Sequence, residues 1–200
     1  MKRLCVFIFA VTSLAACTSS TSEDAEKRPT TVTLLAYDAF TPEEGIFDEF
    51  TNITGITVKV VTGGDSGVLV SKAILTAGNP EGDVLWGVDN TMLSRAQQAS
   101  LLMSYEPVNT GDICVNADKE WFASSDVPIP TRLEDLVLPQ YRGLLVTQDP
   151  VASSPGLGFL LGTIAHFGEG KWQTFWEALK GHVHIAPDWT TAYTVDFSGS

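Results

Sequence analysis

The chain has 200 residues, of which 44% are hydrophobic and 18% charged, a balance typical of packed globular proteins with one or two small domains. Its 24 acidic and 12 basic residues give a formal net charge of −12. This charge argues against a nucleic-acid-binding protein, which needs a basic face to neutralise phosphates, and against attachment to anionic lipid through Lys and Arg.

The N-terminus has the features of an export signal. Lys2 and Arg3 form a short positive segment, and an apolar run follows over residues 4–14. This run is too short to cross a bilayer as a helix, which takes about 20 apolar residues. A Leu-Ala-Ala sequence, typical of a signal-peptide cleavage site, stands directly before Cys17. We therefore predict a signal peptide over residues 1–17.

The position of Cys17 resembles the lipobox of bacterial lipoproteins, in which this Cys becomes the first residue and carries acyl chains. The alternative is an ordinary signal peptide with an incidental Cys. Residues 18–30 are charged and rich in Ser and Thr, which predicts a solvated tether. Removal of the signal changes the formal net charge from −12 to −14. With Cys5 removed and Cys17 acylated, Cys114 has no partner for a disulfide, and its apolar neighbours predict that it is buried.

Strand and helix patterns alternate through residues 31–110. β-branched and apolar runs predict strands, whereas apolar residues at helical spacing predict the segments between them to be helices. The order strand–helix, repeated three times, indicates an α/β domain with a mainly parallel sheet. The expected strands are 31–37, 56–61 and 83–87, and the expected helices run from Pro42 to Gly55, over 68–75, and from an Asp89 cap to about Ala99.

The pattern then restarts over residues 111–200, after a linker expected at 107–111. Thr131 and Glu134 have the spacing of a capping box at the start of a short helix. The predicted fold class is therefore α/β with two lobes, which in an exported protein suggests a solute-binding protein. Strands are expected at 112–116, 144–147 and 182–186, and further helices from the 149–158 turn to Phe167 and over 171–179.

Ligands of open α/β sheets bind beyond the carboxyl ends of the strands. The sharpest motif in such a loop lies at 148–158, where Ser153 and Ser154 precede Pro155 at a predicted helix start. Free N–H groups there favour an anion or an electron-rich oxygen, and Gly156 allows a ligand to approach the backbone. The alternative is a plain Ser-capped helix. The other ligand-facing loops are expected at 37–40, 63–67, 87–90 and 187–193.

Asp65 lies in a Gly-rich turn after a predicted strand, where its carboxylate could pair with a ligand cation or simply cap a helix. Tyr37, Trp189 and Tyr193 lie in ligand-facing loops, and aromatic faces attract cations; packing at the rim is the alternative for these rings. His182 and His184 are two residues apart, but no carboxylate or Cys partners them in a metal-ligand pattern, so we expect no metal site.

No catalytic set emerges from the sequence. It contains no Gly-x-Ser-x-Gly elbow and no phosphate-binding Walker loop, and Ser153 and Ser154 have no obvious activating base. We therefore expect a binding protein that is not an enzyme and needs no cofactor.

Four segments, 37–40, 82–90, 148–161 and 189–193, together resemble thiamine-binding proteins of bacterial ABC transporters, and the resemblance extends over 31–200. It implies a type II periplasmic-binding-protein fold that binds thiamine or thiamine phosphate between its lobes and delivers it to a membrane permease. The resemblance also implies residue roles: Tyr37 stacks on a ring, Asp65 faces the aminopyrimidine with Ser66 or Gly67 beside it, Ser153 and Ser154 face the alcohol or phosphate end, and Trp189 and Tyr193 contribute aromatic faces from the second lobe.

Members of that family are longer, so the second lobe and its return crossings are expected to be incomplete in this chain. Two alternatives stay open. The same fold could bind another solute, such as a polyamine or a ferric ion, although a ferric site favours paired tyrosines and the sequence has no Tyr-Tyr pair. The chain could also be a remnant that binds nothing.

Overall fold

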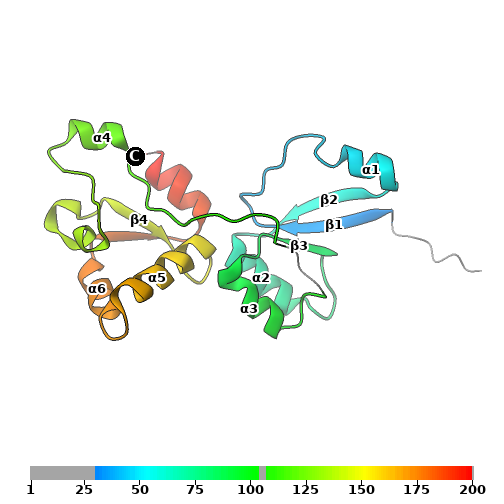
Figure 1. Cartoon of the computed structure of the whole chain (residues 1–200). Coiled ribbons are helices and arrows are strands. Elements are labelled where there is room, and N and C mark those ends of the chain that lie inside the picture. The colour runs from blue at the N-terminus through cyan, green and yellow to red at the C-terminus, as the bar shows by residue number, and fades with distance from the viewer. Residues whose placement is uncertain (1–29, 104–106, 200) are drawn as a thin grey trace, which may run out of the picture.

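The computed structural model of the chain describes residues 30–103 and 107–199, so the predicted signal peptide and Cys17 lie outside the described residues. Figure 1 shows two α/β bodies side by side, joined by an extended segment that follows residue 107. Within the described ranges, no helix is long and apolar enough to cross a membrane.

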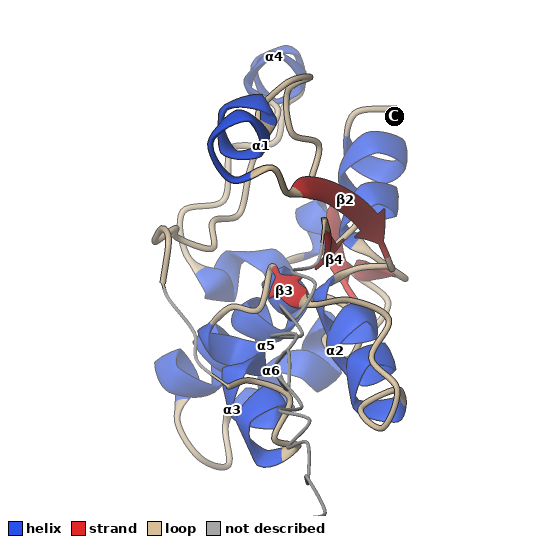
Figure 2. Ribbon diagram, turned by 90° about the vertical axis from the view of Figure 1, so that its right-hand side faces the viewer, coloured by secondary structure: helices blue, strands red, loops and turns tan. Residues whose placement is uncertain are grey.

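The first body is built on a parallel sheet with the strand order β2-β1-β3. Its strands are β1 (Thr31–Ala36), β2 (Thr57–Thr62) and β3 (Val84–Trp86), which confirms the three predicted strands to within two residues at each end. Leu34 of β1 is in register with Val84 of β3. The helices α2 (Ser66–Leu75) and α3 (Asn90–Gln98) lie on one side of this sheet, and α1 (Asp48–Thr54) lies on the other (Figures 1 and 2).

A side-chain cap explains where α3 begins, and a glycine explains where α1 begins. The carboxylate of Asp89 accepts hydrogen bonds from the backbone N–H groups of Thr91 and Met92, which confirms the predicted cap. Helix α1 begins at Asp48, later than predicted from Pro42, because Gly45 adopts a left-handed conformation with φ of 80° and interrupts the chain there.

The core of the first body lies between α2 and α3. Val70, Met92 and Ala96 are buried together in this cluster. Leu157 packs against the same cluster although it belongs to the second body. This apolar contact ties the two bodies together, and it lies directly beside the segments that the sequence singled out.

The second body contains a two-stranded parallel sheet of β4 (Leu145–Gln148) and β5 (Val183–Ala186). Its core includes Leu136, Phe175 and Leu179. An α/β fold with parallel sheets is therefore confirmed, whereas the division of the chain at residue 110 stays a prediction. The remaining elements are α4 (Lys119–Ser124), α5 (Ser154–Phe167), α6 (Trp172–Leu179), the 3-10 helices η1 (Leu133–Val137) and η2 (Pro139–Tyr141), and a π-helix, η3 (Thr191–Phe197).

Three local predictions for the second body are wrong. Residues 112–116 pair with no strand in the described part of the chain, because they belong to the extended segment between the bodies, and Cys114 is exposed rather than buried. The cap before η1 is Arg132 rather than Thr131, since the carboxylate of Asp135, not Glu134, accepts the backbone N–H groups at that end.

Candidate functional site

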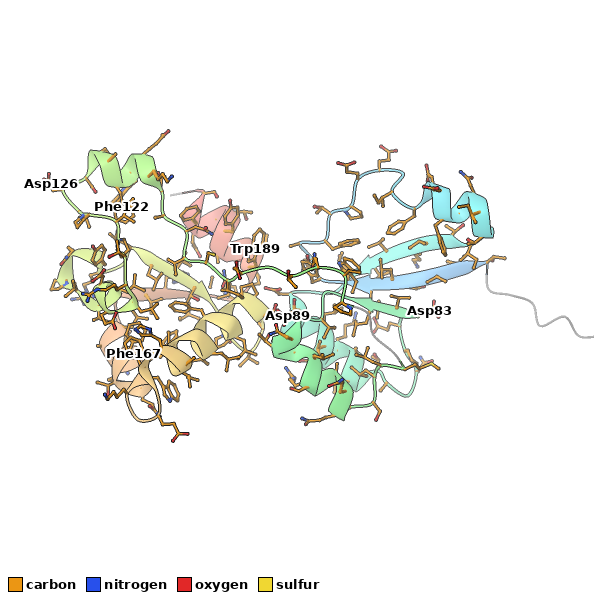
Figure 3. The ribbon with its side chains drawn as sticks, in the orientation of Figure 1. Asp83, Asp89, Phe122, Asp126, Phe167 and Trp189 are labelled. Atoms are coloured by element: carbon orange, nitrogen blue, oxygen red, sulfur yellow. The ribbon has the colours of Figure 1, made fainter. Side chains whose placement is uncertain are left out.

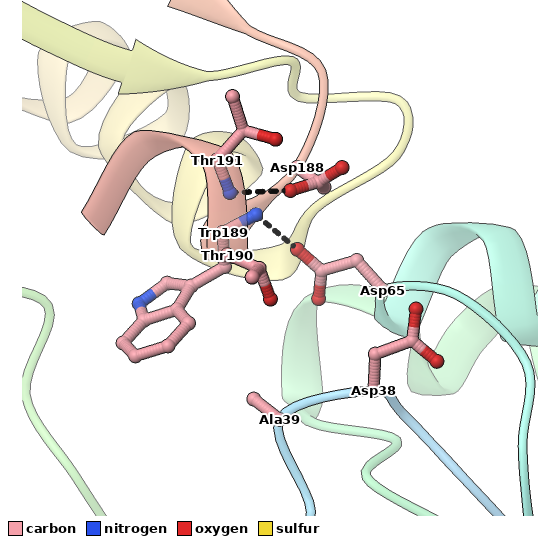
Figure 4. A pocket seen from close by; sticks show the side chains of 7 residues that line it. All are labelled: Asp38, Ala39, Asp65, Asp188, Trp189, Thr190 and Thr191. Carbon is pink, nitrogen blue, oxygen red and sulfur yellow. Dashed lines mark hydrogen bonds between the residues drawn. The ribbon is translucent and has the colours of Figure 1, made fainter. Parts of the chain in front are cut away.

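A pocket of about 310 Å³ lies where the two bodies meet (Figure 4). The first body contributes loops at the carboxyl ends of β1 and β2, and the second body contributes the segment that follows β5. This is the position at which α/β proteins bind ligands. The lining residues are Asp38, Ala39, Asp65, Asp188, Trp189, Thr190 and Thr191.

The carboxylate of Asp65 links the two bodies at this pocket. Its Oδ1 accepts the backbone N–H of Ser66 at 2.7 Å, which caps α2. Its Oδ2 accepts the backbone N–H of Trp189 at 3.0 Å, across 124 residues of sequence. Asp65 is only 8% exposed, so these two hydrogen bonds hold a buried charge. The cap and the ligand-facing role, which the sequence left as alternatives, are therefore compatible.

Trp189 begins a row of stacked aromatic rings. Its indole lies 4.9 Å from the ring of Tyr193 with an interplanar angle of 13°, and Tyr193 stacks on Phe197 at 5.7 Å. Figure 3 shows Trp189 on the side of the second body that faces the first. Trp189 therefore borders the pocket, and its indole is held in place by the rings stacked behind it.

The N-termini of α2 and α5 meet beside the pocket. The backbone N–H of Gly67 donates to the carbonyl of Ala152 at 2.8 Å, and the hydroxyl of Ser154 donates to that of Ser66 at 3.3 Å. Ser153 is fully buried, and its hydroxyl has no hydrogen-bond partner among the described residues. These four predicted site residues thus form a closed contact between the bodies, which we call the contact zone, and they do not line the pocket.

Two further predicted site residues, Tyr37 of the first body and Gly156 of the 148–158 motif, have packing partners. Tyr37 lies against Gly87: a Cβ built on Gly87 would come within 2.1 Å of the Tyr37 ring, and Gly87 has a left-handed φ of 95°. Gly156 is buried at the start of α5, where an added Cβ would lie 2.4 Å from the carbonyl oxygen of Gln148. The ligand-binding roles of Tyr37 and Gly156 remain predictions, as do those of Tyr193 and the contact-zone residues.

Two acidic residues of the pocket were not singled out from the sequence. Asp38 and Asp188 each stand two residues beyond the end of a strand, β1 and β5 respectively. Asp38 accepts the backbone N–H of Gly64, and Asp188 accepts that of Thr191. In each case one carboxylate oxygen makes this bond, and the second has no hydrogen-bond partner in the described part of the chain.

The chemistry of the pocket favours a cation. Three of its seven lining residues are aspartates, and none of the seven is Lys, Arg or His. An indole face adds attraction for a positive charge. Among the described residues, no group of three His, Cys, Asp or Glu side chains is placed so that it could hold a metal ion. The pocket is therefore best matched by an organic cation with an aromatic surface.

A comparison with known families matches residues 86–199 to the bacterial extracellular solute-binding proteins. The chain belongs to this family. The match begins at the last residue of β3 and includes both strands of the second sheet and the segment of Trp189. Its members are exported proteins that bind solutes, in agreement with a pocket between two α/β bodies.

Several curated relatives are thiamine-binding periplasmic proteins. The one from Brucella suis is 26% identical over 204 residues, covering 93% of this chain and 59% of its own length. The one from Escherichia coli is 24% identical, covering 84% of this chain and 57% of its own length. The chain thus spans less than two thirds of the length of these relatives.

Solved structures confirm the fold. A periplasmic thiamin binding protein superposes with a TM-score of 0.67 at 22% identity, covering 84% of this chain and 59% of that one. Iron-bound HitA from Pseudomonas aeruginosa has a TM-score of 0.60 at 23% identity, covering 86% and 60%. The predicted type II periplasmic-binding-protein fold is therefore confirmed.

Proposed function

We propose that this chain is the solute-binding component of a bacterial ABC importer and that its ligand is thiamine. The observation that carries the proposal is the pocket between the bodies, with three carboxylates, one indole face and no basic lining residue. The names of the curated relatives support the choice of ligand.

The parts of thiamine match the pocket in chemical type. Thiamine has a cationic thiazolium, an aromatic aminopyrimidine and a polar tail. The indole of Trp189 would stack on an aromatic ring of the ligand, and Asp65 would accept a hydrogen bond from the amine, because a carboxylate has more acceptor sites than its two present bonds use. Asp38 and Asp188 would each offer a second oxygen.

The contact zone would take part when the bodies separate. Opening would expose the hydroxyls of Ser66, Ser153 and Ser154, which are buried where the two helix N-termini meet. Two-lobed proteins commonly close around a ligand by a hinge motion. In this proposal Tyr37 stacks on a ring of the ligand and Tyr193 contributes an aromatic face, while the polar tail of thiamine, or of its phosphate, points toward the hydroxyls.

In the cell, the chain would hand its ligand to a membrane permease and would catalyse no reaction. We propose that acylated Cys17 anchors it to the membrane after the signal peptide is removed. Metabolic labelling with palmitate tests the anchor: the chain should incorporate the label, and Cys17→Ser should not.

Isothermal titration calorimetry of the chain with thiamine tests the proposed ligand. We expect a dissociation constant in the micromolar range or tighter, and no heat of binding at micromolar ligand would contradict the proposal. Spermidine is the comparison ligand, because three carboxylates also suit a polyamine. Ferric ion is a further comparison, since an iron-bound protein shares the fold. Binding of none of the three would favour the remnant.

Replacing Trp189 by Ala should weaken thiamine binding by roughly 2- to 30-fold, because a cation–π contact contributes about 0.5–2 kcal/mol. Trp189→Phe should lose less, since a ring remains to stack on Tyr193. Titration calorimetry measures both variants. The matched control is Trp121→Ala on α4, an exposed Trp outside the pocket, which should leave affinity unchanged. Equal affinity of Trp189→Ala and the unmodified chain would exclude the indole from the site.

A further inference from the structure

The segment that crosses between the two bodies is held by few contacts. Residues 107–118 form no helix or strand before α4 begins, and residues 107–116 are all exposed. Within the described ranges, no hydrogen bond joins residues 107–117 to another residue. A stretch of chain without hydrogen bonds or burial has little local stability of its own. Side-chain contacts must therefore fix its path between the bodies, which Figure 1 shows in green.

One such contact joins Ile113 to Gly158 of α5, and we call it the seat. A Cβ built on Gly158 would lie 2.6 Å from Cδ1 of Ile113, 3.2 Å from its Cγ1 and 3.9 Å from its Cβ. The Ile side chain thus occupies the space that any other side chain at this position would take. A glycine inside a helix is destabilising relative to Ala, which points to a packing reason for it. Gly162, one turn further along α5, has no atom within 4 Å of an added Cβ.

The start of α5 is also where the second body touches the first. Leu157, directly before Gly158, packs against the core cluster of the first body. Just before the helix, the carbonyl of Ala152 accepts the N–H of Gly67. The seat therefore fastens the crossing segment to the part of the second body that meets the first body.

We propose that Ile113 is a positioning residue: seated on Gly158, it shortens the free chain between the bodies and so favours their closed arrangement. Leu102 of the first body still packs against its core cluster. From Leu102 the sequence runs 11 residues to Ile113 but 16 to Asp118, which caps α4. The probability that two tethered parts meet falls roughly as the −3/2 power of the tether length. Emptying the seat should therefore disfavour closing by about twofold.

Electron paramagnetic resonance of a nitroxide on Cys114 tests the seat. Cys114 is exposed and directly follows Ile113, and successive side chains of an extended chain point to opposite sides, so the label leaves the seat undisturbed. Cys5→Ser and Cys17→Ser in the full chain confine the label to this position. Ile113→Ala empties the seat, and Gly158→Leu fills it. Each should at least double the mobile component of the spectrum.

Two matched controls separate the seat from its surroundings. Val115 flanks Cys114 on the other side and is 51% exposed, against 48% for Ile113, so Val115→Ala should leave the spectrum unchanged. Gly162→Leu should also leave it unchanged, as should Ile113→Val, which keeps the β and γ carbons beside Gly158. Circular dichroism checks folding, and Ile113→Ala decides the question if Gly158→Leu does not fold. A spectrum of Ile113→Ala indistinguishable from that of Val115→Ala would overturn the proposal.

Titration calorimetry with thiamine measures the effect on closing, and this part rests on the proposed function. Ile113→Ala should bind thiamine about twofold more weakly than Val115→Ala, because its longer free chain makes closing less probable. An unmodified chain that binds no thiamine would contradict the proposed function, while the spectra would still decide whether the seat exists. Equal affinities of the two variants, in a chain that binds thiamine, would overturn the positioning role of Ile113.

Discussion

Replacing Asp65 by Asn is expected to weaken thiamine binding by about 30- to 100-fold, the effect of losing a charge-assisted hydrogen bond together with one anionic charge near the cation. The carboxylate now accepts from both Ser66 and Trp189. An amide has a single acceptor oxygen, so Asn must place an NH₂ group against one of these two N–H donors. Either the cap of α2 or the bond to the second body is then lost.

Titration calorimetry with thiamine measures this loss of affinity. The matched control is Asp83→Asn: Asp83 also accepts a backbone N–H, that of Thr33, but lies at the far end of the first body, as Figure 3 shows. We expect its affinity to equal that of the unmodified chain. An Asp65→Asn variant that binds within threefold of the unmodified chain would remove Asp65 from the proposed site.

Local sequence signals were sufficient for most of the fold. The β-branched run of β1 and the Asp89 cap depend on neighbours in sequence, and both predictions are confirmed. The segment 112–116 has the same apolar character as a strand, yet it pairs with no strand among residues 30–103 and 107–199. Strand formation needs a hydrogen-bonding partner, and no local pattern tells whether one is available. Cys114 lies within this unpaired segment and is therefore exposed.

The site was predictable in part, for a related reason. Asp65 and Trp189 line the pocket, as their loops at strand ends suggested. Asp38 and Asp188 occupy equivalent loops, and their position just beyond β1 and β5 was the available signal. This position identified the loops but did not single out the two aspartates, because an Asp after a strand is most often a turn or cap residue. Their convergence on one pocket depends on how the two bodies meet, which no periodicity encodes.

The meeting of the bodies depends on very close backbone approach at Gly67. A Cβ built on Gly67 would lie 2.2 Å from the carbonyl oxygen of Val151 and 2.7 Å from that of Ala152. Both oxygen atoms belong to the backbone, so rotating a side chain cannot relieve the clash with the added Cβ. The same residue donates its N–H to Ala152. Any side chain at this position must therefore separate α2 from the loop before α5 and pull Asp65 away from Trp189.

We therefore expect Gly67→Ala to weaken thiamine binding by roughly 5- to 150-fold, in line with about 1–3 kcal/mol for overpacking a tight contact. Each body should stay folded, because Ala favours helix α2 itself. Small-angle X-ray scattering should give a larger radius of gyration, and calorimetry the affinity. The matched control is Gly162→Ala on α5, where no atom lies within 4 Å of an added Cβ. That substitution should leave affinity unchanged and raise stability by roughly 0.5–1 kcal/mol. If Gly67→Ala bound thiamine as tightly as Gly162→Ala with an unchanged radius of gyration, ligand binding would not require the contact zone to close.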